Sequence, residues 1–205
     1  MNLRQLSTET RGGLRVELAP FRPDDIDRVY WLCQDPEIQR WTTVPTPYHR
    51  EDAQRFVTEY VPTAWREVDD GTFSAEPVGA ELVWAVRVPG DGPTAGLWGS
   101  LGLKRLGQRR LEIGWWLGAD VRGMGIMRAS VAKVLAVAFD ALGASEIWWY
   151  AMEGNEPSAR VAQRTGFAFT GLTTLPMHGD KPVWGAVLRR GGRLMFGPGG
   201  ARIPS

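Results

Sequence analysis

The sequence predicts a single mixed α/β domain, in which helices cover the faces of a mostly antiparallel sheet. The chain has 205 residues, 43% of them hydrophobic, and this is enough to build one sizeable core. Its segments follow the order strand, two helices, three strands, helix, strand, helix and two strands. Strands and helices do not alternate regularly, so a doubly wound parallel sheet does not fit.

The N-terminal part is predicted to hold one strand and two helices. Residues 14–21 alternate apolar and polar side chains, and the acids after Pro23 suit the start of a helix. That helix carries an apolar stripe of Ile26, Val29, Tyr30 and Cys33. A second helical pattern runs over about residues 50–65, after a predicted loop at 41–47, and residues 68–79 are rich in turn formers.

The remaining chain predicts a strand meander followed by alternating elements. Residues 81–88, 95–103 and 110–117 form strand-like runs, which turns of hairpin length separate. The later predictions are a helix at 124–142, a strand at 145–152, a helix at 156–165, and strands at 167–172 and 182–188. We therefore expect one domain over residues 13–190, a flexible N-terminus over 1–12 and a Gly/Pro-rich tail over 191–205.

Composition disfavours several classes of function. Lys plus Arg (24) nearly balance Asp plus Glu (23), so no global charge attracts nucleic acid or an anionic membrane. No apolar run approaches the ~20 residues of a membrane span, and no signal-peptide core follows Met1, so we expect a cytoplasmic protein. The single cysteine, Cys33, excludes an internal disulfide and suits helix packing. No His/Cys/Asp cluster has metal spacing, and we expect no metal.

A glycine turn is the first candidate site. The strand at 111–117 is soon followed by Arg122-Gly123-Met124-Gly125, which opens the long helix. Glycines let backbone N–H groups approach a diphosphate, and the positive end of the helix dipole favours its charge, to which Arg122 could add a contact. The spacing matches neither a P-loop nor the dinucleotide fingerprint. A tight helix entry with no ligand remains the alternative.

A second segment lies at the start of the shorter helix. Asn155 and Ser158 stand where side chains cap a helix, and that helix ends at Gly166-Phe167. By itself this pattern is also typical of ordinary capping.

Together the two segments resemble the GCN5-related N-acetyltransferase (GNAT) superfamily, and within it the ribosomal-protein N-acetyltransferases of RimJ/RimL type. The resemblance covers about residues 13–190 and rests on Arg-x-x-Gly-x-Gly/Ala, here Arg122 to Met127, and on Asn-x-x-Ser ahead of Gly-Phe, here Asn155 to Phe167. The strand at 112–117 and the N-terminal Leu-x-x-Phe-x-x-x-Asp pattern agree with it. Met127 departs from the pattern, since the family prefers Gly or Ala there.

The resemblance implies a GNAT fold that binds acetyl-CoA. Its mostly antiparallel sheet would have about seven strands, be flanked by four helices, and splay open between the fourth strand (111–117) and the fifth (147–152). The pantetheine arm would pair with the backbone near Ile113, Trp115 and Leu117, much as an added strand would. The pyrophosphate would bind the N–H groups that follow Arg122, those of Gly123, Met124, Gly125, Ile126, Met127 and Arg128. Asn155 would hold the pantetheine amide or the turn, and Ser158 would lie near the sulfur.

The resemblance also implies an N-acetyltransferase mechanism. Transfer requires a free amine, and Glu112 is the candidate base, acting through a water. Its alternative is an exposed strand residue paired with Arg109 or Arg110. Many members use a Tyr to protonate the leaving thiolate, but Ala162 stands at that position, so Ser158 is the catalytic candidate there. A backbone N–H near Trp115 is the expected oxyanion donor.

The acceptor is the least defined part of the prediction. A protein N-terminal amine and a small-molecule amine are both open, and a CoA-binding regulatory module without transferase activity is the alternative function. Trp41, Tyr48, Trp149 and His178 are candidates to line the acceptor site, although the ten tryptophans of the chain suit a core equally well and His178 suits an exposed loop. A homodimer is compatible with exposed sheet edges, but no residue pattern fixes it.

Overall fold

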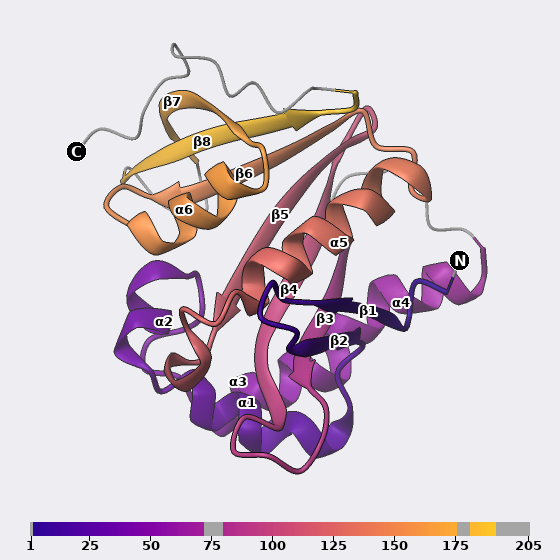
Figure 1. Ribbon diagram of the computed structural model, residues 1–205. Helices are drawn as coiled ribbons and strands as arrows, with labels where there is room; N and C mark the ends of the chain where they lie inside the picture. Colours follow the sequence, from indigo (N-terminus) through magenta and orange to yellow (C-terminus); the bar gives the residue numbers. More distant parts are fainter. Residues whose placement is uncertain (1, 72–79, 176–180, 192–205) are drawn as a thin grey trace.

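The computed structural model describes residues 2–71, 80–175 and 181–191, and an eight-stranded sheet forms its centre (Figure 1). The strands lie in the order β1-β2-β3-β4-β5-β6-β8-β7, and every neighbouring pair is antiparallel except β5 and β6. Their bounds are β1 Leu6–Glu9, β2 Arg15–Ala19, β3 Glu81–Val88, β4 Gly96–Gly107, β5 Arg110–Leu117, β6 Glu146–Met152, β7 Ala168–Thr174 and β8 Pro182–Arg189. The predicted mixed α/β architecture and the antiparallel meander are confirmed.

The sheet has one strand more than expected, because the segment predicted to be a flexible N-terminus contains β1. Leu6–Glu9 pairs with Arg15–Ala19 through a tight turn at Gly13, where φ is +79°. Leu6 is buried, and β1 packs against helix α5 (Ile126–Asp140). This contact joins residues far apart in the chain, so local composition could not reveal it.

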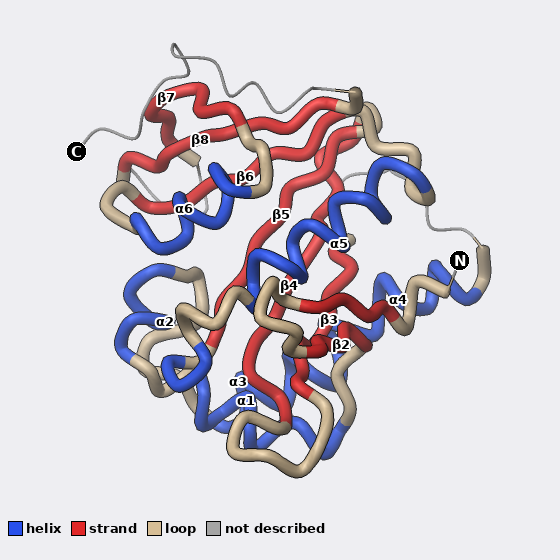
Figure 2. Tube along the Cα trace, viewed as in Figure 1, coloured by secondary structure: helices blue, strands red, loops and turns tan. Residues whose placement is uncertain are grey.

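Helices cover both faces of the sheet (Figure 2). The α-helices are α1 Ile26–Leu32, α2 Pro36–Trp41, α3 Arg50–Arg55, α4 Val61–Asp69, α5 Ile126–Asp140 and α6 Glu156–Arg164. A π-helical segment, η2 (Phe56–Tyr60), joins α3 to α4, so the helical stretch predicted at 50–65 is continuous but irregular. There are thus more helices than the expected four. None of the helices in the described ranges is long and apolar enough to cross a membrane.

Helix α2 was not predicted, although its start has an ordinary signal. The Asp35 carboxylate accepts a hydrogen bond from the Glu37 N–H at 2.9 Å, and Pro36 occupies the first helical position. The helix is only six residues long and ends at Trp41. Such a short helix shows little periodicity, which explains why the sequence pattern did not reveal it.

The sheet opens between β5 and β6. These strands pair in parallel only over Arg110–Ile113 and Glu146–Trp149. Beyond this point β5 continues along β4 to Leu117, while β6 continues along β8 to Met152. The two strands therefore diverge, as the predicted splay requires, and one edge of residues 114–117 has no partner strand.

Candidate functional site

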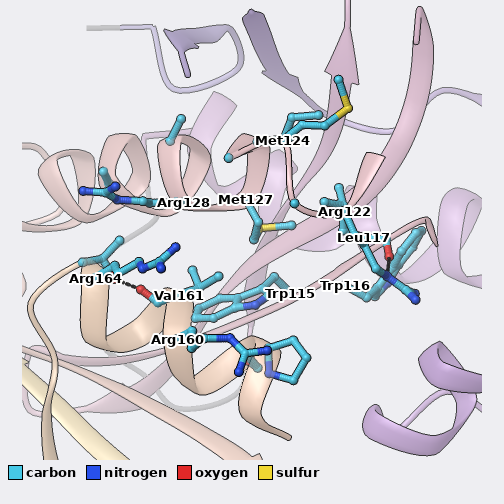
Figure 3. A pocket seen from close by; sticks show the side chains of 18 of the residues that line it. Trp115, Trp116, Leu117, Arg122, Met124, Met127, Arg128, Arg160, Val161 and Arg164 are labelled. Atoms are coloured by element: carbon cyan, nitrogen blue, oxygen red, sulfur yellow. Dashed lines mark hydrogen bonds between the residues drawn. The ribbon is translucent and has the colours of Figure 1, made fainter. Parts of the chain in front are cut away.

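A cavity of about 900 Å³ lies where β5 and β6 diverge (Figure 3). Its wall combines the end of β5, the turn before α5 with the first turns of that helix, one side of α6, helix α2, the β1–β2 turn and Leu188 of β8. Many predicted cofactor residues line it: Trp115, Leu117, Arg122, Gly123, Met124, Gly125, Ile126, Met127, Arg128, Asn155 and Ser158. Ile113 is the exception, since its side chain is buried in the core and only its backbone belongs to the opening strand.

The turn before α5 presents a row of backbone donors. Gly123 and Gly125 have φ values of +81° and +80°, a left-handed conformation that favours glycine, and Gly125 is the N-cap of the helix. The first hydrogen bond around the helix start runs from the Ala129 N–H to the Gly125 carbonyl at 3.0 Å. No described group accepts a hydrogen bond from the N–H groups of residues 123–128. This arrangement is suited to an anion with several oxygens.

Arginines surround these donors. Five line the cavity: Arg11, Arg122, Arg128, Arg160 and Arg164. Arg160 forms an ion pair with Glu156 at 3.0 Å along α6. The cavity wall therefore combines helix-terminal N–H groups with positive side chains, which is the environment that a polyphosphate requires.

Arg122 has a different role from the expected phosphate contact. Its guanidinium donates to the Asp35 carboxylate at 2.5 Å and to the Leu117 carbonyl at 2.9 Å. Arg122 thereby ties the N-cap of α2 to the end of β5. In this arrangement the Arg122 guanidinium donates its hydrogen bonds to groups of the protein itself.

Bulky side chains narrow the cavity beside the opening of the sheet. Met127 lines it and is only 5% exposed. Trp115 reaches the same region, close to Val161 (Figure 3), and stacks on Trp149 with ring centroids 6.2 Å apart. The Met127 side chain thus fills more of the cavity than the Gly or Ala that the family prefers at this position.

The start of α6 forms the facing wall. The Asn155 side chain accepts from the Ser158 N–H at 3.2 Å, so Asn155 caps the helix. The Ser158 hydroxyl oxygen accepts from the Trp149 indole N–H at 3.2 Å. Ala162 is fully buried and offers no hydroxyl. Two hydroxyl-bearing residues of this segment therefore line the cavity: Ser158 in the first turn of α6 and Thr165 directly after the helix.

Glu112 lies outside the residues that line the cavity, on the face of β5 that also carries Gly114 and Trp116. It is partly buried, and burial raises the pKa of its carboxyl above the usual range; the Glu81 carboxylate adds to this rise and Lys104 opposes it. The alternative pairing with Arg109 is not observed, because that guanidinium donates to the Gly143 carbonyl at 2.7 Å. A raised pKa suits a general base that works near neutral pH.

The predicted acceptor residues are only partly brought to the site. Trp41 lines the cavity and donates its indole N–H to Glu37 at 2.8 Å. Tyr48 is 5% exposed and contacts Cys33, and Trp149 is 1% exposed, so both are core residues rather than lining residues. Period-two alternation in β6 places Trp149 with the buried Ile147 and Ala151. His178 lies outside the described residues.

Several lining residues were not predicted. Among them are Glu9, Arg11 and Gly12 at the end of β1 and in the turn after it, Glu37, Ile38 and Thr42 in and after α2, and Arg160, Val161 and Arg164 on α6. The α6 group could have been found, since it continues the face of Pro157 and Ser158 at helical spacing. The other groups depend on elements that the sequence pattern did not reveal. Within the described ranges, no cluster of three or more His, Cys, Asp or Glu could hold a metal ion.

Comparison with known proteins gives this geometry a family. Residues 15–168 match the family described as "Acetyltransferase (GNAT) domain". The "Putative ribosomal N-acetyltransferase YdaF" of Bacillus subtilis (strain 168) is 36% identical over 101 residues, which are 46% of this chain and 55% of that protein. The chain thus matches only about half the length of this relative.

Solved structures agree in fold. The "Structure of a putative ribosomal-protein-serine acetyltransferase from Vibrio cholerae" superposes with a TM-score of 0.70 at 15% identity, covering 90% of this chain and 98% of that one. Mycobacterium smegmatis RimJ in complex with CoA-disulfide gives a TM-score of 0.67 at 20% identity, covering 90% of this chain and 86% of that one. With most of its length matched by the family description, the chain belongs to the GNAT acetyltransferase family.

Proposed function

We propose that the protein transfers the acetyl group of acetyl-CoA to a primary amine, with the N-terminal amine of a protein as the acceptor. The observation that carries this proposal is the row of free N–H groups at residues 123–128, which lies beside an opening in the sheet. Membership of the GNAT family and the ribosomal-protein acetyltransferase names of its relatives support it.

The cavity wall suggests how the cofactor binds. The pyrophosphate would accept hydrogen bonds from the N–H groups of residues 123–128, and Arg128 and Arg164 would add positive charge near its phosphates. The pantetheine arm would lie along the open edge of residues 114–117 and take the place of a neighbouring strand. That placement would bring the thioester to the region between Trp115 and Ser158.

Residues on both faces of β5 would supply the expected steps, because Glu112 and Trp115 lie on opposite faces of that strand. Glu112, through a water, would take a proton from the ammonium, and the free amine would attack the thioester carbon. A backbone N–H near Trp115 would donate to the oxyanion of the tetrahedral intermediate. The C–S bond would then break, and the thiolate would take the second amine proton, with Ser158 orienting the sulfur. Because Ala162 stands where many members have the Tyr, and the Ser158 hydroxyl is a poor acid, proximity carries much of this mechanism.

A thiol-release assay tests the proposal. The purified protein is incubated with acetyl-CoA and one of three acceptor samples: a peptide with a free N-terminal serine, the same peptide with its N-terminus already acetylated, or a set of small primary amines. We expect thiol release with the first peptide only, and a mass increase of one acetyl group at its N-terminus. Thiol release with the small amines but not with the peptide would show that the acceptor is a small molecule and not a protein N-terminus. Tight CoA binding without release on any amine would instead favour a CoA-binding regulatory module.

A further inference from the structure

A row of charged side chains crosses the sheet on the face opposite α5. The register places Glu81 of β3 directly opposite Lys104 of β4, and Lys104 directly opposite Glu112 of β5. Directly opposed residues share a face of the sheet, so these three side chains form one line across three strands. The next residue of the line, on β6, is Trp148. Glu112 therefore has a cation as its immediate neighbour and a second carboxylate one strand further away.

Glu81 is held in a defined position. The Tyr60 hydroxyl, from η2, donates a hydrogen bond to its carboxylate. The carboxylate leans over Gly102, since a Cβ atom built on that glycine would lie 1.9 Å from Glu81 Oε1. Only a glycine at position 102 leaves room for this orientation. In this orientation the half-buried Glu81 side chain places its carboxylate over the backbone of β4.

The neighbouring position is open. Gly102 lies directly opposite Gly114, and Gly114 is exposed, with no atom within 4 Å of a Cβ atom built on it. Gly114 thus leaves uncovered backbone beside the charged row, whereas the Glu81 carboxylate covers Gly102. Gly114 also begins the strand edge that lacks a partner beyond Ile113. An acceptor that approaches over Gly114 would meet the carboxylates on one side and the opening of the sheet on the other.

The other titratable and charged groups near Glu112 are few. Tyr150 of β6 has a pKa raised by burial and by the Glu112 charge, with Arg110 of β5 opposing this rise. The Tyr60 pKa is raised by burial, by Glu81 and also by Glu112. The Tyr150 ring stacks on Trp148 with centroids 5.9 Å apart. Aromatic rings and carboxylates together form an environment that favours an organic cation such as an ammonium.

We propose that Glu81 and Lys104 are positioning residues, which act on Glu112 in opposite directions and so set the pH at which it accepts the proton of a cationic acceptor amine. The proposal rests on the transferase function proposed above. Lys104 stabilises the charged carboxylate of Glu112, and Glu81 stabilises its neutral, protonated form. Burial raises the pKa of the Glu81 carboxyl, and the hydrogen bond from Tyr60 and the charge of Lys104 oppose that rise. Tyr60 therefore acts through Glu81 by favouring its charged form.

The proton transfer in this arrangement is balanced. The acceptor arrives as R–NH₃⁺, and the Glu112 carboxylate takes one proton, directly or through a water. The neutral amine attacks the thioester, the N–C bond forms and the C–S bond breaks. The remaining excess proton on nitrogen goes to the thiolate, and Glu112 returns its proton to solvent. Glu81 and Lys104 stay outside these bond changes.

Side-chain carbon NMR of Glu112 tests the proposal without any acceptor. The midpoint of its titration is measured in the wild type, Glu81→Gln, Lys104→Met and Tyr60→Phe. We expect Glu81→Gln to lower it by about 0.5 to 1 pH unit and Lys104→Met to raise it by a similar amount. Tyr60→Phe should lower it by less than Glu81→Gln. Signal assignment comes from the loss of the Glu112 resonance in Glu112→Gln.

Matched controls separate charge from structure. Glu51→Gln and Lys181→Met remove the same charges at exposed positions on other elements and should leave the midpoint unchanged. Shifts in one common direction, or no shift in either variant of the row, would overturn the proposal. In the pH profile of kcat/KM, the midpoint of the acid limb should shift in each variant in the same direction as the NMR midpoint of Glu112. If the midpoints move in opposite directions but no acceptor is ever acetylated, the charge coupling stands and the proposed transferase function fails.

Discussion

The two sides of the proposed site are built in different ways. The cofactor side uses consecutive residues: the turn Arg122 to Arg128 supplies its donors, and one short helix supplies Asn155 and Ser158. The acceptor side uses single residues from three strands, which only the register brings together. A chain segment can therefore carry the signature of a cofactor site, while an acceptor site of this kind becomes visible only in the folded sheet.

The two sides also differ in charge. Free N–H groups and arginines make the cofactor side positive, whereas two carboxylates flank a single lysine on the acceptor side. Cofactor binding and proton transfer should consequently respond to different substitutions.

Replacing Glu112 with Gln should have the largest effect on activity. We expect kcat/KM for the acceptor to fall by about 100-fold at low pH, because Gln cannot take the amine proton. The deficit should shrink as the pH rises towards the pKa of the amine, where the free base forms without help. Steady-state rates across pH measure this, and calorimetry should show unchanged CoA affinity. Equal rates for mutant and wild type at every pH would remove Glu112 as the base.

Replacing Gly125 with Val should act on the cofactor side alone. Its φ of +80° costs a β-branched residue about 1–2 kcal/mol, so the turn should deform and CoA affinity should drop by about 5- to 30-fold. Calorimetry with CoA measures this effect. Gly71→Val is the matched control, since Gly71 also has a positive φ, +67°, but lies after α4 and does not line the cavity. Wild-type affinity in Gly125→Val would refute the placement of the pyrophosphate.

Replacing Ser158 with Ala tests how far the cofactor side takes part in the chemistry. If Ser158 only orients the thiol, kcat should fall by less than about tenfold. The Trp149 indole N–H would also lose its acceptor, which should lower the free energy of unfolding by about 1 kcal/mol in urea titrations. Ser130→Ala on α5 serves as a control, because it removes a hydroxyl that is buried and lies outside the cavity lining. A hundredfold loss of kcat would instead assign proton donation to Ser158.

The ion pair between Arg122 and Asp35 should give the smallest effect. A double-mutant cycle with Arg122→Ala and Asp35→Ala should yield a coupling of about 0.5–1 kcal/mol in the free energy of unfolding, since both groups are partly exposed. Both variants should weaken CoA binding to the same small degree, because either one releases α2 from the β5–α5 turn. A much larger loss in Arg122→Ala alone would show that this arginine contacts the cofactor.

The sequence predicted the parts of the molecule that are continuous in the chain. The strands β3 and β5 match their predicted ranges, and the glycine turn and the α6 cap line the cavity. The extra strand β1 was missed because its burial depends on a distant helix, α5. Tyr48 and Trp149 were assigned to the acceptor side, but aromatic character alone does not tell a core residue from a lining one. The partners of Glu112 could not be predicted without the register of β3 and β4.

The interrupted ladder between β5 and β6 also bears on how the protein survives in the cell. A strand edge without a partner is normally found at the rim of a sheet, where it invites pairing with other chains, but here it lies in the middle of the sheet. A bound cofactor that covers this edge would add RT ln(1 + [L]/Kd) to the stability, about 2.7 kcal/mol at a hundredfold excess over Kd. The supply of the cofactor would then set the working lifetime of the protein as well as its rate.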